Sequence, residues 1–265
     1  MKKIFNYLHY ISIKKIINFK DAYNFGDLFE KQNSKWFIIP VTHPKYDRES
    51  SQNLIQLEEP ILKNLYDNME IDDLQDDERG WYREKYVDEF KGKRILDLGC
   101  GSGKDGIFFA KRGAHLTFAD LIQSNLDLVK KMTDIYKINA NFYHITSFED
   151  YAALGEFDFI WAQGSLHHNP IHITKLIVKK LSTNFVKNQR FLILSYPKER
   201  WINDGRPIYR NWGKFTDGPG TPWAQPFEKK EINYIFNNKS KILFEKKWNF
   251  ISNTNNFIFF DILCK

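Results

Sequence analysis

A glycine-rich stretch near the middle of this 265-residue chain carries residues whose types and spacing could do chemistry. Ile95–Leu98 is a short, mostly apolar run, which is typical of a strand covered on both faces of a sheet. Gly99, Gly101 and Gly103 follow at alternate positions, and glycine permits both a tight reversal and the close approach of a ligand to the backbone. Asp97 lies inside the strand, where an ionised side chain needs a partner. The pattern therefore predicts a turn that holds a small ligand.

Two other glycine motifs fit this stretch less well. A phosphate-binding P-loop has four residues between its glycines, followed by Lys and Ser or Thr, whereas the spacing here is three residues and Asp105 follows the lysine. The dinucleotide motif G-x-G-x-x-G matches formally at residues 101–106, with an acid, Asp120, near the expected distance beyond it. Nicotinamide-binding turns usually have an apolar residue at the position of Asp97, which counts against that reading.

The run Leu96–Gly103 resembles the first motif of class I S-adenosylmethionine-dependent methyltransferases. The resemblance implies that the methionine end of the cofactor, S-adenosyl-L-methionine, lies against this turn, with Asp97 holding its ammonium directly or through water. It also implies that Asp120, at the end of the next strand, accepts hydrogen bonds from the ribose hydroxyls. Residues 146–148 correspond to the adenine region, although the acid common there is missing. The cofactor-binding residues expected from this resemblance are Asp97, Gly99, Cys100, Gly101, Gly103, Asp120, Leu121, Ser147, Phe148, Gln163 and, on a preceding helix that would cover the cofactor, Trp81.

A second motif, Gln163–Pro170, follows the predicted fourth strand on the edge where doubly wound sheets bind ligands. Its Leu-His-His segment is similar to segments that line the methyl-transfer pocket of small-molecule methyltransferases. His167 or His168 could take the proton from an acceptor hydroxyl as its oxygen attacks the methyl group. Alternatively, both histidines could simply shape the loop and satisfy backbone groups.

Two further interpretations of this motif are disfavoured. Enzymes that methylate the amino groups of bases carry Asp/Asn-Pro-Pro-aromatic here, whereas Asn169-Pro170 is followed by isoleucine. Zinc binding would need more ligands than the two histidines, and His172 alone does not complete a set, so we expect no metal.

The stretch Tyr196–Pro226 is long for a connector and rich in Trp, Arg, Gly and Pro. Flat apolar rings together with fixed cations suit a sugar or a phosphorylated acceptor. We therefore expect an acceptor lid over 196–226, although its tryptophans could instead pack down as a structured surface loop. The net charge of +6 and the pI of about 9.0 also favour an anionic partner. The expected acceptor-binding residues are Tyr196, Arg200, Arg206, Arg210 and Trp223.

Alternating strands and helices, as in a doubly wound sheet, must position these motifs. Strands are expected at 95–98, 115–120, 141–145, 157–162, 191–195, 242–250 and 257–263, with a short extended run at 36–40. Helices are expected at 54–69, 81–90, 107–112, 125–137 with Ser124 as its cap, 171–181 and 227–236. By resemblance, the fold is α/β: a Rossmann-like, seven-stranded, mostly parallel sheet of order 3-2-1-4-5-7-6 with its last strand antiparallel. We expect an N-terminal helical appendage over 1–78 and the S-adenosylmethionine-binding domain over 79–265.

Composition and the amino terminus suggest the cellular setting. Cys100 and Cys264 cannot form a disulfide framework, so a reducing cytoplasm is the simplest location. Lysines and a histidine interrupt the first apolar stretch, which argues against an export signal, and no run approaches the ~20 apolar residues of a membrane span. Apolar residues at 4, 8 and 11 predict a helix that packs on the protein or a partner, or lies on a membrane surface. The acidic stretch Asp72–Glu78 is expected to be a solvated linker.

Together these patterns predict a methyltransferase that acts on a small polar, anionic acceptor. O-methylation of a surface-carbohydrate or phosphoryl compound, and hence a place in carbohydrate biosynthesis, is the preferred hypothesis. The alternatives are an RNA 2′-O-methyltransferase, so nucleic acid is not excluded as a partner, a nicotinamide-dependent oxidoreductase, or a non-catalytic cofactor-binding subunit. The oligomeric state is left open.

Overall fold

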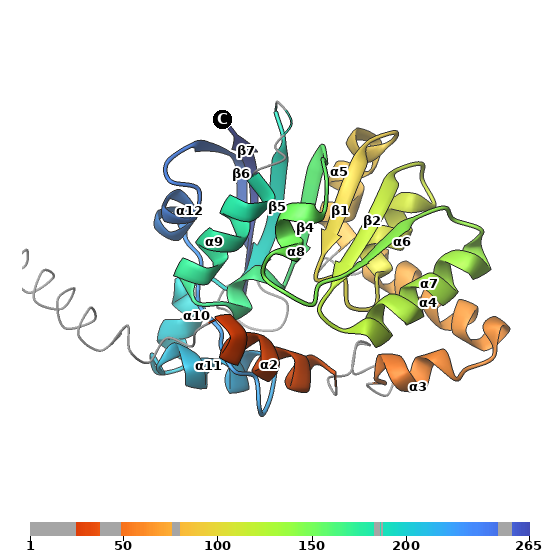
Figure 1. Ribbon diagram of the computed structural model, residues 1–265, viewed down its shortest axis with the longest axis horizontal. Coiled ribbons are helices and arrows are strands. Elements are labelled where there is room, and N and C mark those ends of the chain that lie inside the picture. Colours follow the sequence, from red (N-terminus) through yellow and green to blue (C-terminus); the bar gives the residue numbers. More distant parts are fainter. Residues whose placement is uncertain (1–24, 38–48, 76–79, 183–185, 187, 249–255) are drawn as a thin grey trace, which may run out of the picture.

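The computed structural model describes residues 25–37, 49–75, 80–182, 186, 188–248 and 256–265, and its strands form one sheet. The seven strands follow the order β3-β2-β1-β4-β5-β7-β6 (Figure 1). Strand β7 pairs antiparallel with β5 and β6, and the other neighbours pair in parallel. The predicted α/β class, strand order and reversed last strand are confirmed. The strands are β1 (Arg94–Leu98), β2 (His115–Asp120), β3 (Asn141–His144), β4 (Phe159–Gln163), β5 (Arg190–Ser195), β6 (Ser240–Trp248) and β7 (Phe257–Cys264).

The central strands are buried on both faces because their apolar residues continue through both side-chain directions. In β1, Ile95 packs into one hydrophobic cluster, whereas Leu96 and Leu98 pack into the other. The residues of β5 from Phe191 to Leu194 alternate between the same two clusters. Successive side chains of a strand point to opposite faces, so an unbroken apolar run requires a layer of helices on each side.

Helices provide both layers. Residues of α8, α9 and α12 pack against one face of the sheet, and residues of α3 to α7 pack against the other. The helices are α2 (Phe25–Trp36), α3 (Ser51–Ile55), α4 (Glu59–Gln75), α5 (Gly80–Phe90), α6 (Lys104–Ala110), α7 (Gln123–Tyr136), α8 (Asp150–Ala153), the 3₁₀ turn η3 (Leu166–His168), α9 (Ile171–Leu181), α10 (Lys198–Asn203), α11 (Tyr209–Thr216) and α12 (Lys229–Ile235).

The region 54–69, predicted as one helix, contains parts of two helices, α3 and α4. The hydroxyl of Ser50 caps the short helix α3 by accepting a hydrogen bond from the Asn53 amide, and the chain turns before α4 begins. Pro60 is the second residue of α4, in the first turn, where its missing N–H has no helical partner to lose. The single-helix prediction was therefore wrong at this break.

Other local predictions also differ from the structure. Trp36 ends helix α2 instead of beginning an extended run. Part of the acidic stretch predicted as solvated linker is helical, because α4 continues to Gln75. Ser124 lies inside α7, and its hydroxyl accepts a hydrogen bond from Gln52 instead of capping the helix.

Helix α2 lies across the carboxyl edge of the sheet, where the functional motifs were predicted. Gln32 Nε2 donates to the His168 carbonyl at 2.7 Å, and Lys35 donates to the Pro219 carbonyl. Figure 1 shows α2 along the lower edge of the sheet, close to α11. The apolar positions 4, 8 and 11 lie outside the described residues. No helix in the described ranges has the length and apolar character needed to cross a membrane.

Candidate functional site

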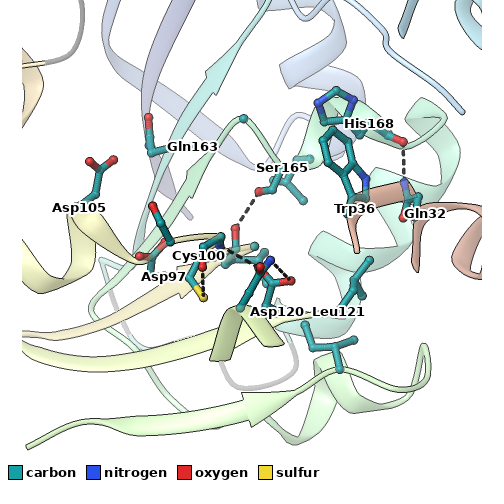
Figure 2. A pocket seen from close by; sticks show the side chains of 18 of the residues that line it. Gln32, Trp36, Asp97, Cys100, Asp105, Asp120, Leu121, Gln163, Ser165 and His168 are labelled. Carbon is teal, nitrogen blue, oxygen red and sulfur yellow. Dashed lines mark hydrogen bonds between the residues drawn. The ribbon is translucent and has the colours of Figure 1, made fainter. Parts of the chain in front are cut away.

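A cavity of about 280 Å³ opens at the carboxyl ends of β1, β2 and β4. Figure 2 shows that it lies between the glycine turn after β1 and the side chains of helix α2. Parallel α/β sheets bind their ligands at this edge because the loops that follow the strands converge there. The lining residues are Gln32, Trp36, Asp97, Leu98, Gly99, Cys100, Gly101, Ser102, Lys104, Asp105, Asp120, Leu121, Asn125, Ile145, Tyr151, Gln163, Gly164, Ser165, Leu166, His168 and Asn169.

One end of the cavity is acidic. Asp97 and Asp105 are both buried and both line it, together with Gln163 (Figure 2). Burial, and next the negative charges of Asp105 and Asp120, hold the pKa of Asp97 well above its ordinary value. The Gln163 side-chain oxygen is buried without a hydrogen-bond partner among the described groups. This end of the cavity therefore favours a ligand that brings a positive charge and N–H donors.

The glycine turn leaves no room for larger side chains at its first position. Gly99 has φ +71°, and a Cβ there would lie 2.5 Å from the Ser165 Cβ. Ser165 is itself held by a hydrogen bond of 2.7 Å from its hydroxyl to the Leu98 carbonyl. A left-handed backbone in this contact requires glycine, so the turn brings bare backbone against the cavity.

Three hydrogen bonds hold the carboxylate of Asp120. Its carboxylate accepts hydrogen bonds from the Gly101 amide at 2.9 Å, the Ile122 amide at 2.9 Å and the Asn125 side chain at 3.2 Å. Burial nevertheless raises its pKa, because these hydrogen bonds only partly offset desolvation. The side chain is thus fixed in direction and ties the glycine turn to the start of α7.

A buried ion pair network supports the acidic end from behind. Arg83 is 1% exposed, and its guanidinium bridges Asp105 and Asp73 with contacts of 2.5–2.7 Å. Trp161 Nε1 donates to the other oxygen of Asp105 at 3.2 Å. Because both oxygens of Asp105 have partners, its carboxylate stays in a fixed orientation beside the cavity. The network also fastens helices α4 and α5 to α6.

The two histidines have different surroundings. His168 lines the cavity, its Nδ1 donates to the Trp223 carbonyl at 2.9 Å, and its ring lies 4.7 Å from that of Trp36. His167 is 1% exposed, does not line the cavity, and its Nδ1 donates to the Leu194 carbonyl at 3.3 Å. Burial, and next the neighbouring His168, lower the pKa of His167 well below the ordinary value. His168 is therefore the better placed of the two to meet a ligand.

Helix α2 contributes the wall opposite the acidic end. Gln32 is buried and donates to the His168 carbonyl and, at 3.3 Å, to the Asn169 side-chain oxygen. Trp36 is partly exposed and presents a flat ring to the cavity beside His168 (Figure 2). A neutral polar and aromatic wall of this kind suits a small organic ligand.

The cavity gathers part of the residue set that the sequence indicated for the cofactor. The lining includes Asp97, Gly99, Cys100, Gly101, Asp120, Leu121 and Gln163. It does not include Gly103, Ser147, Phe148 or Trp81. Gly103 instead allows the turn to pack on α7, since a Cβ there would lie 2.5 Å from Val129. Trp81 packs against Trp248 and Phe259, with ring centroids 5.2 and 5.4 Å away.

The two residues expected near the adenine, Ser147 and Phe148, lie outside the cavity lining. Ser147 is exposed, and its amide donates to Asp150 at 2.8 Å. Phe148 packs beside Tyr151, with ring centroids 6.0 Å apart. Ile145 and Tyr151 line the cavity in their place. Sequence reasoning also missed Gln32, Trp36, Lys104, Asp105 and Asn125, of which Lys104 and Asp105, the two residues after the glycine turn, carried a local signal.

The segment 196–226 forms helices α10 and α11 with a small core of its own. Tyr196, Trp212 and Ala224 make that core, and Trp212 is fully buried. Arg200 stacks on Tyr196, 4.4 Å from the ring centroid, while Arg206 is exposed. None of the five residues expected to bind the acceptor, Tyr196, Arg200, Arg206, Arg210 and Trp223, belongs to the described cavity lining.

Known proteins match the central part of the chain in sequence. Residues 95–183 fit a family model described as a methyltransferase domain. The ubiquinone biosynthesis O-methyltransferase of Aromatoleum aromaticum is 37% identical over 83 residues, which are 30% of this chain and 34% of that protein. The magnesium-protoporphyrin O-methyltransferase of Rhodobacter capsulatus is 32% identical over 79 residues, which are 30% of this chain and 35% of that protein. The match thus spans about a third of the length of these curated relatives.

Solved structures match a larger part of the chain. The magnesium protoporphyrin IX methyltransferase of Synechocystis, crystallised with S-adenosylhomocysteine, superposes with a TM-score of 0.52 at 17% identity. The superposition covers 70% of this chain and 82% of that one, which shows a shared fold. Residues 95–183 are therefore a methyltransferase domain, and the chain has the fold of the class I S-adenosylmethionine-dependent methyltransferases.

Proposed function

We propose that this chain is an enzyme that transfers a methyl group from S-adenosylmethionine to a hydroxyl oxygen of a small molecule. The observation that carries the proposal is the acidic cavity at the glycine turn, on the ligand-binding edge of a methyltransferase fold. The O-methyltransferases among the relatives support the choice of oxygen as the methylated atom.

The residues of the cavity fit this cofactor. S-adenosylmethionine carries an ammonium and a sulfonium, and the cavity provides Asp97, Asp105 and the Gln163 oxygen, which has no hydrogen-bond partner among the described groups. The glycine turn would hold its methionine end, and Asp120 would accept hydrogen bonds from its ribose hydroxyls. When bound, the cofactor supplies an electrophilic methyl group. The chain's own task is to orient the acceptor, exclude water and take up the acceptor's proton.

His168 is the proposed proton acceptor. Its Nδ1–H is held by the Trp223 carbonyl, so the free lone pair of a neutral ring is on Nε2. The Trp36 ring packs against the imidazole at an interplanar angle of 58° and would shield the acceptor from water. His167 is the weaker candidate because it lies behind this wall and holds a proton poorly.

The net charge of the chain and the arginines of segment 196–226 bear on the charge of the acceptor. The net charge of +6 supports an anionic carbohydrate or phosphoryl compound, as do the arginines of segment 196–226. No arginine is among the described residues that line the cavity, and Arg200 stacks on Tyr196. We therefore propose a small polar hydroxyl compound whose anionic group, where it has one, stays outside the cavity and faces those arginines.

Calorimetric titration with S-adenosylhomocysteine and, separately, with NADH tests the cofactor assignment. Binding of the first and not the second is expected. Binding of NADH alone would favour the oxidoreductase alternative and overturn the proposal.

The reaction is tested with a panel of hydroxyl-bearing small molecules and radiolabelled S-adenosylmethionine. His168→Gln should lower the rate ~10²–10⁴-fold with the best acceptor, while the affinity for S-adenosylhomocysteine stays nearly unchanged. An unaltered rate would assign proton removal to another group. Label transfer to RNA alone, in a salt-dependent manner, would favour the RNA 2′-O-methyltransferase alternative.

A further inference from the structure

Three side chains at the edge of the cavity bring possible metal-ligand atoms close together. They are His167, His168 and Asp217, which we call the His–Asp cluster. One ligand atom from each residue lies within 4.8 Å of the other two. His168 Nε2 is 3.5 Å from Asp217 Oδ2. The cluster joins η3 to the end of α11, two parts of the chain that are 49 residues apart.

Backbone carbonyls determine the tautomer of both imidazoles. The Leu194 carbonyl accepts from His167 Nδ1 and the Trp223 carbonyl accepts from His168 Nδ1. A carbonyl oxygen can only accept, so each Nδ1 carries the hydrogen, and the Nε2 atom of each neutral ring has a free lone pair. Histidines that bind metals show this arrangement, because the second N–H is given to a carbonyl or carboxylate that orients the ring.

The carboxylate of the cluster is oriented in the same way. Tyr196 donates its hydroxyl hydrogen to Asp217, 3.0 Å from both carboxylate oxygens. Metal-binding carboxylates commonly have such an outer hydrogen bond. Hydrogen bonds with groups outside the cluster thus orient all three side chains and leave the space between them open.

Lys35 places a positive charge near Asp217, which leaves the imidazole nitrogens to be satisfied. A proton on His168 Nε2 would satisfy the pair with Asp217, yet it would leave His167 Nε2, which is buried and has no hydrogen-bond partner among the described groups. An unpaired buried acceptor is costly. One metal ion would satisfy all three atoms.

We propose that the His–Asp cluster binds a divalent transition metal ion, with zinc as the best fit. Two imidazoles and one carboxylate are a common donor set for this ion. The edge of a zinc tetrahedron with bonds of ~2.0–2.1 Å is about 3.3 Å long, close to the 3.5 Å between His168 and Asp217. A modest closing of the His167 side would complete three-point coordination.

The metal would regulate the methyl transfer instead of assisting it. His168 lines the described cavity whereas Asp217 and His167 do not, so the ion would lie at the cavity's edge, beside His168. His168 Nε2 has a single lone pair, and it cannot bind the metal and accept a proton at the same time. This consequence rests on the proposed function, whereas the metal site itself does not.

Zinc titration of the chelator-treated full chain, followed by calorimetry, tests the site. We expect one tight zinc ion per chain and, with cobalt(II) as a probe, visible absorption typical of tetrahedral coordination. His167→Gln and Asp217→Asn should each weaken zinc binding ~100-fold or more, and Tyr196→Phe about 10-fold. His115→Gln, an exposed histidine at the start of β2, is the matched control and should change nothing.

Folding is checked by circular dichroism of each metal-free variant. Wild-type protein that binds no zinc would overturn the proposal, and so would tight zinc binding that His167→Gln and Asp217→Asn leave intact. Either result would leave the proposed methyl transfer standing, because S-adenosylhomocysteine binding and label transfer are measured without metal. Failure of those measurements, with zinc bound as expected, would overturn the function and spare the metal site.

Discussion

At the scale of single residues, the buried acids of the cavity lower the stability of the free protein and would favour binding of a cationic ligand. Asp97 lies in a buried strand, and its closest charged neighbours in the cavity are also acids. Such a position disfavours the ionised form in the free protein, as its raised pKa indicates. A cationic ligand would reverse this disadvantage. Asp97 would therefore stabilise the bound cofactor, although its ionised form destabilises the free protein.

Asp97→Asn should raise the melting temperature of the free protein at neutral pH and weaken S-adenosylhomocysteine binding. The folded protein binds the Asp97 proton more tightly than the unfolded chain does, so this residue's contribution falls as pH rises from the unfolded pKa through the folded one. The advantage of the variant should therefore vanish in acid, below the unfolded pKa. Thermal melts across pH together with calorimetry check this, and a variant that is less stable at neutral pH would contradict it.

Asp120→Ala should weaken cofactor binding by about 1–3 kcal/mol, because the ribose hydroxyls lose a charged acceptor. The same change removes the partner of the Gly101 and Ile122 amides, so the melting temperature should fall as well. Calorimetry with S-adenosylhomocysteine on folded protein measures the affinity. Asp127→Ala, an exposed acid on α7, is the control. Equal affinities for wild type and Asp120→Ala would remove the ribose contact from this residue.

At the scale of elements, helix α2 adds a wall to the cavity at the sheet edge. Its attachment is local and polar: Gln32 binds the His168 carbonyl and the Asn169 side chain, and Lys35 binds the Pro219 carbonyl. Leu28 anchors the helix in the core of one face. An element held by a few such contacts can open without global unfolding, which would admit a cofactor as large as S-adenosylmethionine.

Gln32→Ala should loosen α2 selectively. The loss leaves the His168 carbonyl without this donor and removes about 1–3 kcal/mol of local protection, so amides in 25–37 should exchange hydrogen ~5- to 150-fold faster. Hydrogen–deuterium exchange with mass spectrometry measures this, and β1 should be unaffected. Ser34→Ala on the exposed side of α2 is the matched control. Unchanged exchange in the Gln32 variant would show that other contacts hold the helix.

At the scale of the whole molecule, charge is distributed unevenly. The chain carries a net charge of +6, yet three carboxylates, Asp97, Asp105 and Asp120, line its cavity. A net positive charge would favour the approach of anionic compounds, while the carboxylates of the cavity would favour a cationic group. Net charge is thus informative about the acceptor's approach and not about the cofactor pocket.

Binding of S-adenosylhomocysteine should release protons and strengthen as pH rises. The pKa values of Asp97 and Asp120 are raised in the free protein, and a bound ammonium lowers them, so the ligand favours the deprotonated state. The affinity should level off once both acids are ionised in the free protein. Calorimetry in two buffers with different ionisation enthalpies counts the protons. Affinity that falls with rising pH over the range where these acids titrate would contradict the prediction.

The sequence by itself determined the sheet and the glycine turn. Apolar runs that continue through both faces of β1 and β5 require a covered parallel sheet, and the alternating glycines with Asp97 predict a backbone that a ligand can approach. Asp120 was predictable for a similar reason, since it ends a strand beside that turn. These features depend on neighbouring residues, whose spacing directly controls backbone conformation and the direction of side chains.

Only the tertiary structure shows which side chains lie opposite the glycine turn and the two histidines. Trp36 and Gln32 reach the cavity from a helix more than 130 residues away from His168, and Asp217 meets the two histidines across 49 residues. The arginines that the sequence placed at the acceptor lie outside the cavity lining, because Tyr196 and Trp212 form a separate core beneath their segment. No spacing rule encodes such meetings. They follow from how complete elements pack, and each depends on many side chains at once.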